Sequence, residues 1–259
     1  MLNIGVSTAC MYPRLLEEVI EEYGKSGIRV IELFINSYSE MSPNYINELK
    51  KRMDYYGIKV CSVHPFTSGL EPLMFFSEYP RRVSDMLDVY KRFFEICQQL
   101  SADVFVLHGD RKDSKTLPEF YAEQYNKLAL TAEPFHVTVA QENICRCKSG
   151  DLNYLKRLIE LLDGKIKFVF DIKQAVRSGL NPLEVLNIMG DRVVHLHLND
   201  HLPQKDCLLP GNGGFDFQHL AQLVKKFPAS PSMVIEVYRH DFQTIGDLLN
   251  SLNFLYKIF

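Results

Sequence analysis

The sequence predicts an α/β protein with the (β/α)8 TIM barrel fold. Short β-rich runs alternate with longer helical patterns along the whole chain, eight of each. Such alternation is typical of a parallel sheet, and right-handed crossovers place the helices outside it. The length of 259 residues matches the ~250 residues that one such barrel needs. No segment resembles a linker, so we expect one domain over residues 1–259.

The predicted strands are short runs rich in β-branched and aromatic residues. The first is LNIGVST, and the stretch IGVSTACMYPR offers only one glycine, so this unit lacks the glycine fingerprint of a dinucleotide-binding fold. Eight strand-plus-helix units in this length favour a closed barrel over an open doubly wound sheet. The expected strands cover residues 2–8, 29–35, 58–64, 103–109, 136–143, 165–171, 192–200 and 232–238.

The predicted helices show apolar residues at helical spacing and recognisable ends. In the first helix, Leu15, Leu16 and Val19 form an apolar stripe that stops at Gly27. In the second, Ser42 and Pro43 are good starting residues and Gly57 a good terminator. The expected helices cover residues 13–27, 42–57, 82–100, 118–134, 151–162, 174–189, 215–227 and 244–258.

Composition and charge exclude several classes of protein. With 29 basic and 32 acidic side chains the formal charge is −3, so no global field draws the chain onto nucleic acid or an anionic membrane. No run approaches ~18 apolar residues, and the amino terminus lacks the pattern of a signal peptide. The six cysteines are scattered through a large chain. They predict reduced thiols and a cytoplasmic location.

Cys145 and Cys147 lie two residues apart in the loop that follows Glu142. A structural zinc site normally combines two C-x₂₋₄-C pairs, and no second pair is evident in the sequence. We therefore interpret both as ordinary loop cysteines.

Four apolar runs each end in one residue that can bind a metal. VTVAQ precedes Glu142, IKFVF precedes Asp171, VVHL leads to His197 and MVI precedes Glu236. The intervals are 29, 26 and 39 residues, close to the ~30 of one strand-plus-crossover-helix unit, so the four residues are expected at one rim of the barrel. Carboxylates with one imidazole suit one divalent cation such as Mn²⁺, Mg²⁺, Co²⁺ or Zn²⁺.

Other polar residues also lie at predicted strand ends or within these strands: Glu32, His64, His108 and His195. Each alone has an ordinary structural explanation. Several carboxylates at one mouth would repel each other without a cation, since an unpaired buried carboxylate is costly. His195 and His197 point to the same face of one strand. We prefer His197 as the ligand because it lies nearer the carboxyl end, with His195 one layer deeper as a supporting or core polar group.

Two long loops follow the third and seventh predicted strands. PFTSGLEPLMFFSEYP, directly after His64, is either a lid or substrate wall, or a surface loop covering the barrel mouth. GNGGFDF, residues 211–217, either binds phosphate at a helix start or simply forms a tight turn. Lys173 and Lys205 could meet an anionic substrate, but we interpret them as solvated surface lysines.

The motifs resemble the xylose isomerase-like barrels, which include sugar and sugar-phosphate isomerases and epimerases and share their fold with apurinic endonucleases. The resemblance covers essentially the whole chain. It rests on QEN at Glu142, FDIKQA at Asp171, HLHLND at His197 and IEVY at Glu236, with SVHPF and LHGD as weaker support. Each motif is short, but the four occur in the expected order and spacing.

This resemblance implies that Glu142, Asp171, His197 and Glu236 hold one divalent metal and that Glu142 and Glu236 also act as base and acid. A metal chelated by a carbonyl and the adjacent hydroxyl would stabilise the enediolate formed when a neighbouring C–H loses its proton. One glutamate would remove that proton and the other would deliver one to the opposite face.

The chain departs from the family pattern in two places. Many members have histidine three residues after the aspartate, where this chain has Gln174, which can hydrogen-bond a sugar but is a poor metal ligand. The endonuclease branch uses an Asp-x-His pair after strand seven for a third zinc, and residues 200–217 contain none. His64, His108 and Glu142 do match another zinc position of that branch, so a second metal stays possible.

The sequence thus predicts a metal-dependent sugar or sugar-phosphate isomerase or epimerase acting on a small-molecule substrate. The alternatives are an inosose-type dehydratase, an endonuclease-like phosphodiesterase and a non-catalytic sugar-binding barrel. His64, His108, Gln174 and Glu32 are candidates for a second metal or for substrate binding. We expect neither a membrane nor a nucleic acid as partner, and a homo-oligomer is compatible with the sequence.

Overall fold

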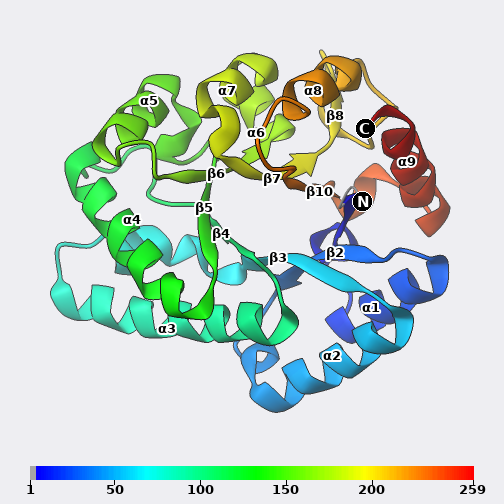
Figure 1. The fold of residues 1–259 in the computed structure, drawn as a ribbon, viewed down its shortest axis with the longest axis horizontal. Coiled ribbons are helices and arrows are strands. Elements are labelled where there is room, and N and C mark those ends of the chain that lie inside the picture. The colour runs from blue at the N-terminus through cyan, green and yellow to red at the C-terminus, as the bar shows by residue number, and fades with distance from the viewer. Residues whose placement is uncertain (1–3) are drawn as a thin grey trace.

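The computed structural model describes residues 4–259 and contains a closed parallel barrel of eight strands (Figure 1). The barrel strands follow chain order around the barrel, and β1 closes it by pairing with both β2 and β10. The predicted fold is therefore confirmed. The barrel strands are β1 (Ile4–Ser7), β2 (Val30–Ile35), β3 (Lys59–Pro65), β4 (Val104–Leu107), β5 (Thr138–Glu142), β6 (Lys167–Asp171), β7 (Val193–Leu198) and β10 (Ser232–Ile235).

Helices surround the barrel on its outside (Figure 1). Their ends follow the sequence signals: Ser42 caps α2 through its side chain, and Gly27 and Gly57 end α1 and α2 in the left-handed conformation. The helices are α1 (Leu16–Ser26), α2 (Pro43–Tyr56), α3 (Pro80–Leu100), α4 (Pro118–Ala132), α5 (Leu152–Leu161), α6 (Ile172–Arg177), α7 (Pro182–Met189), α8 (Phe217–Val224) and α9 (Ile245–Ile258).

Some predicted boundaries differ from the structure. Leu2 and Asn3, at the start of the first predicted strand, lie outside the described residues. The single helix expected over residues 174–189 is wrong, because α6 and α7 are separate. Gly179 adopts a φ of 72° between them, and Asn181 caps a new helix that has Pro182 in its first turn. These three residues provide a complete stop and restart.

The long loops after β3 and β7 contain structure of their own. After β3, a 3-10 turn (Phe66–Gly69) leads into a π-helical turn (Glu71–Phe75). After β7, β8 (Asp200–Leu202) and β9 (Lys205–Leu208) form an antiparallel hairpin.

The glycine-rich segment that follows this hairpin folds around the Asp200 carboxylate. That carboxylate accepts hydrogen bonds from the backbone N–H groups of Gly211, Gly213 and Phe215. A Cβ on Gly213 would lie 2.4 Å from Asp200 Oδ1, so the close approach requires glycine. Because the Asp200 carboxylate already accepts hydrogen bonds from these N–H groups, the segment is better explained as a tight turn than as a phosphate-binding site.

The large apolar core lies between the strands and the surrounding helices, where side chains such as Phe105, Phe168 and Leu196 are buried. Inside the barrel, Val104, Val106, Ala140 and Val169 form a small separate cluster. Tyr256 of α9 donates a hydrogen bond to the carbonyl of Ile4, which ties the last helix to the first strand. Among residues 4–259, no helix has both the length and the apolar character needed to cross a bilayer.

Candidate metal centre and active site

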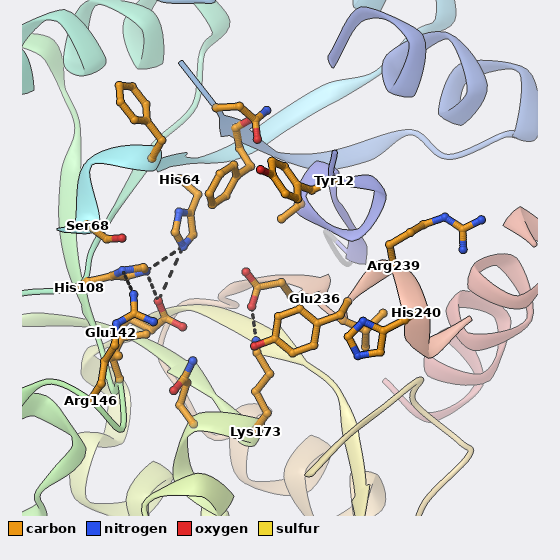
Figure 2. A pocket seen from close by; sticks show the side chains of 18 residues that line it. Tyr12, His64, Ser68, His108, Glu142, Arg146, Lys173, Glu236, Arg239 and His240 are labelled. Carbon is orange, nitrogen blue, oxygen red and sulfur yellow. Dashed lines mark hydrogen bonds and ion pairs between the residues drawn. The ribbon is translucent and has the colours of Figure 1, made fainter. Parts of the chain in front are cut away.

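The carboxyl ends of the barrel strands open into a pocket of about 600 Å³ (Figure 2). His64, His108, Glu142, Lys173 and Glu236 line it. Glu142 is the last residue of β5, and Glu236 directly follows β10. In Figure 2 Glu142 lies beside His64 and His108, and Glu236 lies beside Lys173. The pocket therefore lies at the carboxyl-terminal face of the barrel, where the active sites of enzymes with this fold are found.

Strand register brings four predicted site residues together. In β6 and β7, Asp171 pairs with His197, and His197 also pairs with Val234 two residues before Glu236. His197 Nδ1 lies 3.2 Å from Glu142 Oε1, 3.3 Å from Glu236 Oε2 and 3.6 Å from Asp171 Oδ2. One ligand atom from each of the four residues lies within 4.8 Å of the others.

Backbone and amide contacts fix the orientation of Asp171. Its Oδ1 caps α6 by accepting from Gln174 N at 3.2 Å, and it also accepts from Asn199 Nδ2 at 3.1 Å. Asn143 holds the Asp171 backbone through both its amide N–H and its carbonyl. These bonds occupy Oδ1, so Oδ2 is the oxygen that faces His197.

A buried polar layer lies behind His197, away from the three carboxylates. Glu32 Oε2 lies 3.1 Å from His197 Nε2 and 3.2 Å from His195 Nε2. Ser7 and Ser62 donate hydroxyl hydrogen bonds to the two Glu32 oxygens. Glu32 is fully buried and lies outside the pocket lining. It is placed to hold His197 with Nδ1 toward the carboxylates, as carboxylates often do for metal-binding histidines.

A second group of possible ligands shares Glu142 with the first. His64, His108 and Glu142 place one ligand atom each within 4.8 Å of one another. His108 Nε2 lies 3.0 Å from Glu142 Oε2 and 3.0 Å from His64 Nε2. Glu142 is therefore the residue at which two adjacent sites would meet.

Lys173 corrects the expectation of a solvated surface lysine. Only 4% of its surface is exposed, and its ammonium donates hydrogen bonds to Asp171 Oδ2 and Glu236 Oε2. Figure 2 shows it reaching the pocket floor beside Glu236. Lys205 does match that expectation, since 48% of its side chain is exposed and it pairs with Asp241 at 3.0 Å.

Charge interactions outweigh burial at Glu142, Glu236 and His197, but not at Asp171. Burial alone would raise the pKa of Glu142 and Glu236, but His197 outweighs it, with help from His108 or Lys173, and lowers both. Burial raises the pKa of Asp171, and the neighbouring Glu236 and Glu142 add to that effect. Burial alone would lower the pKa of His197, yet Glu236, Glu32 and Glu142 raise it well above its usual value.

The donor set of the cluster fits a divalent cation. Three carboxylates and one imidazole are the ligand types that Mn²⁺, Co²⁺, Zn²⁺ and Mg²⁺ accept. Glu142 Oε2 is buried and, among the described residues, receives no hydrogen bond of good geometry despite its proximity to His108. A buried carboxylate oxygen in that state is costly, and a bound cation would satisfy it.

The remaining candidates have simpler surroundings. Gln174 lines the pocket, and its Oε1 accepts from Cys145 N at 3.2 Å. Its amide nitrogen stays available to a substrate oxygen. Within residues 4–259, none of the possible metal groups includes a cysteine, and an ordinary role for Cys145 and Cys147 stays a prediction.

The sequence analysis missed three residues that shape the site, Asn143, Asn199 and Arg146, and it named Lys173 but misjudged its surroundings. Both asparagines directly follow strand ends within the motifs that carried the resemblance, which was the available signal. Arg146 lies in the loop after β5 with NH2 3.4 Å from His108 Nδ1. Its place at the pocket depends on how that loop folds back, for which the sequence gives no spacing signal.

Comparisons with known proteins agree with this architecture. The model of a family described as xylose isomerase-like TIM barrel matches residues 20–258. An uncharacterised protein of Mycobacterium leprae is 24% identical, with 92% of this chain and 89% of the relative covered.

Solved structures with the same fold include several sugar epimerases. A D-tagatose 3-epimerase-like protein superposes with a TM-score of 0.81 at 20% identity, covering 99% of this chain and 97% of the other. The 3-keto-D-glucoside 4-epimerase of E. coli gives 0.78 at 17% identity, covering 99% and 100%. D-psicose 3-epimerase of Clostridium cellulolyticum H10 gives 0.79 at 16% identity, covering 99% of each chain.

Proposed function

Because the chain belongs to the xylose isomerase-like TIM barrel family, we propose that it is a divalent-metal-dependent sugar or sugar-phosphate isomerase or epimerase. The observation that carries the proposal is the position of Glu142 and Glu236 at one pocket floor, 3.2 and 3.3 Å from the same atom, His197 Nδ1. The structural neighbours of this chain include a D-tagatose 3-epimerase-like protein, a 3-keto-D-glucoside 4-epimerase and a D-psicose 3-epimerase.

Glu142, Asp171, His197 and Glu236 would hold the metal. When bound, a divalent cation polarises a ketone and stabilises negative charge that develops on its oxygen. Asp171 is held for this role by Asn143 and Asn199 through the hydrogen bonds described above. Glu32 would keep His197 Nε2 protonated, so that Nδ1 is the nitrogen free to bind.

Glu142 and Glu236 would transfer the proton. The charges around them hold the pKa of both carboxyl groups below the ordinary value, so both are ionised at neutral pH. Either can then accept a proton from the carbon next to the ketone. Glu142 lies beside His108 and Glu236 beside Lys173 (Figure 2), so one carboxylate could remove a proton from one face of a substrate held between them, while the other, after taking a proton from solvent, delivers it to the opposite face.

Two arginines at the pocket edge favour a substrate with an anionic group. Arg146 and Arg239 both line the pocket. Within residues 4–259 neither lies within ion-pair distance of a carboxylate, and the Arg239 guanidinium donates to the carbonyls of Phe242 and Gln243. An unpaired guanidinium is well suited to a phosphate. This supports including ketose phosphates among the candidate substrates.

A second candidate function is metal-dependent phosphodiester hydrolysis. It is supported by the His64–His108–Glu142 group, which would hold a second cation beside the first. The absence of an Asp-x-His pair in residues 200–217 and the net charge of −3 argue against a three-zinc nuclease site. An inosose dehydratase would need the same enolate as an epimerase, whereas a non-catalytic sugar-binding barrel would move no proton.

Deuterium exchange tests the proposal directly. Metal-loaded protein is incubated in D₂O with D-tagatose, D-psicose, a 3-keto-glucoside and ketose phosphates, and NMR follows deuterium entering carbon. We expect exchange with at least one substrate. In Glu142→Gln and Glu236→Gln variants we expect the rate to fall by about 10²–10⁴-fold, the usual contribution of a positioned acid or base.

Glu48→Gln is the matched control, because Glu48 is exposed on α2 and distant in the fold from the pocket lining. Its exchange rate should equal that of the unmodified protein. Unchanged exchange in both site variants would remove the two glutamates from the mechanism.

A further inference from the structure

Lys173 and a bound metal would contend for the same two oxygens. The Lys173 ammonium donates to Asp171 Oδ2 and Glu236 Oε2. These same atoms lie 3.6 and 3.3 Å from His197 Nδ1, the imidazole atom that faces the carboxylates. A cation bound by all four residues would therefore have to share or take over the oxygens that Lys173 now holds.

The charge balance of the cluster also indicates that Lys173 and a metal compete. Glu142, Asp171 and Glu236 supply three carboxylates, and the Lys173 ammonium cancels part of their negative field. A carboxylate oxygen can contact two cations, but two cations at contact distance repel strongly in a buried site. The lysine therefore makes the cluster tolerable without a metal and less attractive to one.

The Lys173 side chain has room for a second position, in which its ammonium points into the pocket. The side chain lines the pocket as well as contacting the carboxylates. Its partners among the described residues are these two carboxylates. A four-carbon stem with free rotation could carry the ammonium from the carboxylates into the pocket without movement of the backbone.

We propose that Lys173 is an internal competitor for the metal: it holds Asp171 and Glu236 in the metal-free protein and yields them when a divalent cation binds. The inference rests on the proposed function, because it takes Asp171 and Glu236 as metal ligands. Its consequence is a metal affinity weaker than the four ligands alone would give, with a positive charge returned to the substrate pocket on loading.

Isothermal titration of the metal-free full chain with Mn²⁺ at fixed pH and ionic strength tests this inference. Lys173→Met removes the ammonium and keeps an apolar stem of similar length, while Lys173→Gln keeps hydrogen-bond donors without the charge. We expect both variants to bind Mn²⁺ at least tenfold more tightly than the unmodified protein. Lys205→Gln removes an exposed lysine near the same face and should leave the affinity unchanged. If one Lys173 variant fails to fold, the other suffices.

Each outcome has a distinct meaning. Tighter binding in the Lys173 variants, or binding in them alone, supports the competition. Equal or weaker binding in the variants, with measurable binding in the unmodified protein, overturns it and leaves the metal-dependent function intact. If Mn²⁺ binds none of the proteins, the competition is overturned as well, and deuterium exchange in the presence of EDTA then shows separately whether the proton-transfer proposal survives.

Discussion

At the residue scale, Glu32 connects the barrel interior to the four proposed metal ligands. It lies one layer below the pocket and touches His197 through Nε2, while Nδ1 faces the three carboxylates. Burial alone would raise the pKa of Glu32, but His197 and His195 lower it well below its ordinary value. Glu32 therefore stays ionised and fixes the direction in which His197 points.

We predict that Glu32→Gln weakens metal binding. The amide can still accept a hydrogen bond, but it no longer raises the basicity of His197 or fixes its tautomer, so we expect the dissociation constant to rise by about 10–100-fold. Titration calorimetry with Mn²⁺ measures the change, with Glu48→Gln as the control. An unchanged dissociation constant would mean that Glu32 serves only the packing of the interior.

At this scale, the sequence predicted the proposed metal ligands but not the role of the lysine beside them. Glu142, Asp171, His197 and Glu236 could be proposed together because each ends an apolar run, and strand ends converge in a barrel. Lys173 was misjudged because its burial depends on Glu236, 63 residues later in the chain. Two residues after a strand end, a lysine has no sequence signal that separates a solvated side chain from one folded back onto the site.

At the element scale, the segment after β3 is held against β4 by one buried acid. Glu71, in the π-helical turn, is fully buried, and its Oε2 accepts from the backbone of Gly109 at 2.6 Å. Burial raises the pKa of Glu71 to about 7. Gln124 of α4 donates to the carbonyl of Phe75 at 2.6 Å and anchors the other end of the turn. This part of the loop is packed, while Phe66 and Ser68 reach the pocket lining.

Glu71 gives the protein a pH-dependent stability of defined sign. Since its pKa is higher in the folded state than in the unfolded chain, the folded state binds more protons between about pH 4.3 and 7. Stability from this group is present at low pH and is lost as the pH rises through that window. We predict that Glu71→Gln, which cannot ionise, gains stability relative to the unmodified protein by up to about 3 kcal/mol between pH 4.5 and 8.

Urea unfolding of both metal-free proteins across that range measures the difference between their free energies of unfolding. Titrating groups that do not interact with Glu71 contribute equally to both proteins and cancel, whereas His108, whose pKa Glu71 helps to raise, belongs to the measured difference. A difference that is constant with pH would contradict the role assigned to Glu71.

Within the break between α6 and α7, the demand for glycine at position 179 comes from backbone conformation and not from crowding. An added Cβ at Gly179 meets no atom within 4 Å, yet the residue has a φ of 72°. We predict that Gly179→Ala lowers the free energy of unfolding by about 1–2 kcal/mol, the cost of a left-handed alanine. Gly214→Ala is the control, because that site is equally open and has no positive φ. Equal unfolding midpoints for the two variants would contradict the prediction.

Sequence patterns placed all eight barrel strands, since each is a short apolar run between turn signals. They merged α6 with α7 because the apolar spacing continues through the break. Gly179, Asn181 and Pro182 together were the stronger signal, and giving them more weight would have separated the two helices. The helical turns after β3 were not expected, because they depend on tertiary anchors such as Glu71.

At the scale of the whole molecule, metal binding and folding should be coupled. The four proposed ligands come from β5, β6, β7 and the residue after β10, so the unfolded chain has no comparable site. We predict that Mn²⁺ at one hundred times its dissociation constant adds about 2.7 kcal/mol to the free energy of unfolding. For a chain of this size that corresponds to a rise in Tm of about 5–10 °C.

Differential scanning calorimetry with and without Mn²⁺ measures this shift, and EDTA should reverse it. The Asp171→Asn variant is expected to show a much smaller rise. An equal rise in that variant would place the metal elsewhere on the molecule. The single domain over residues 1–259, the cytoplasmic location and a homo-oligomer stay predictions.

Closure of the barrel also sets the order in which the centre can be completed during synthesis. β1 is synthesised before the other barrel strands, but its pairing with β10, which forms the closing seam of the barrel, requires β10 to be made. Glu236 follows β10 directly. A nascent chain on the ribosome therefore carries three of the four proposed ligands before Glu236 is added, 39 residues after His197. Until the seam forms, such a chain has no complete centre, so metal capture would report that β10 has been synthesised and has paired with β1.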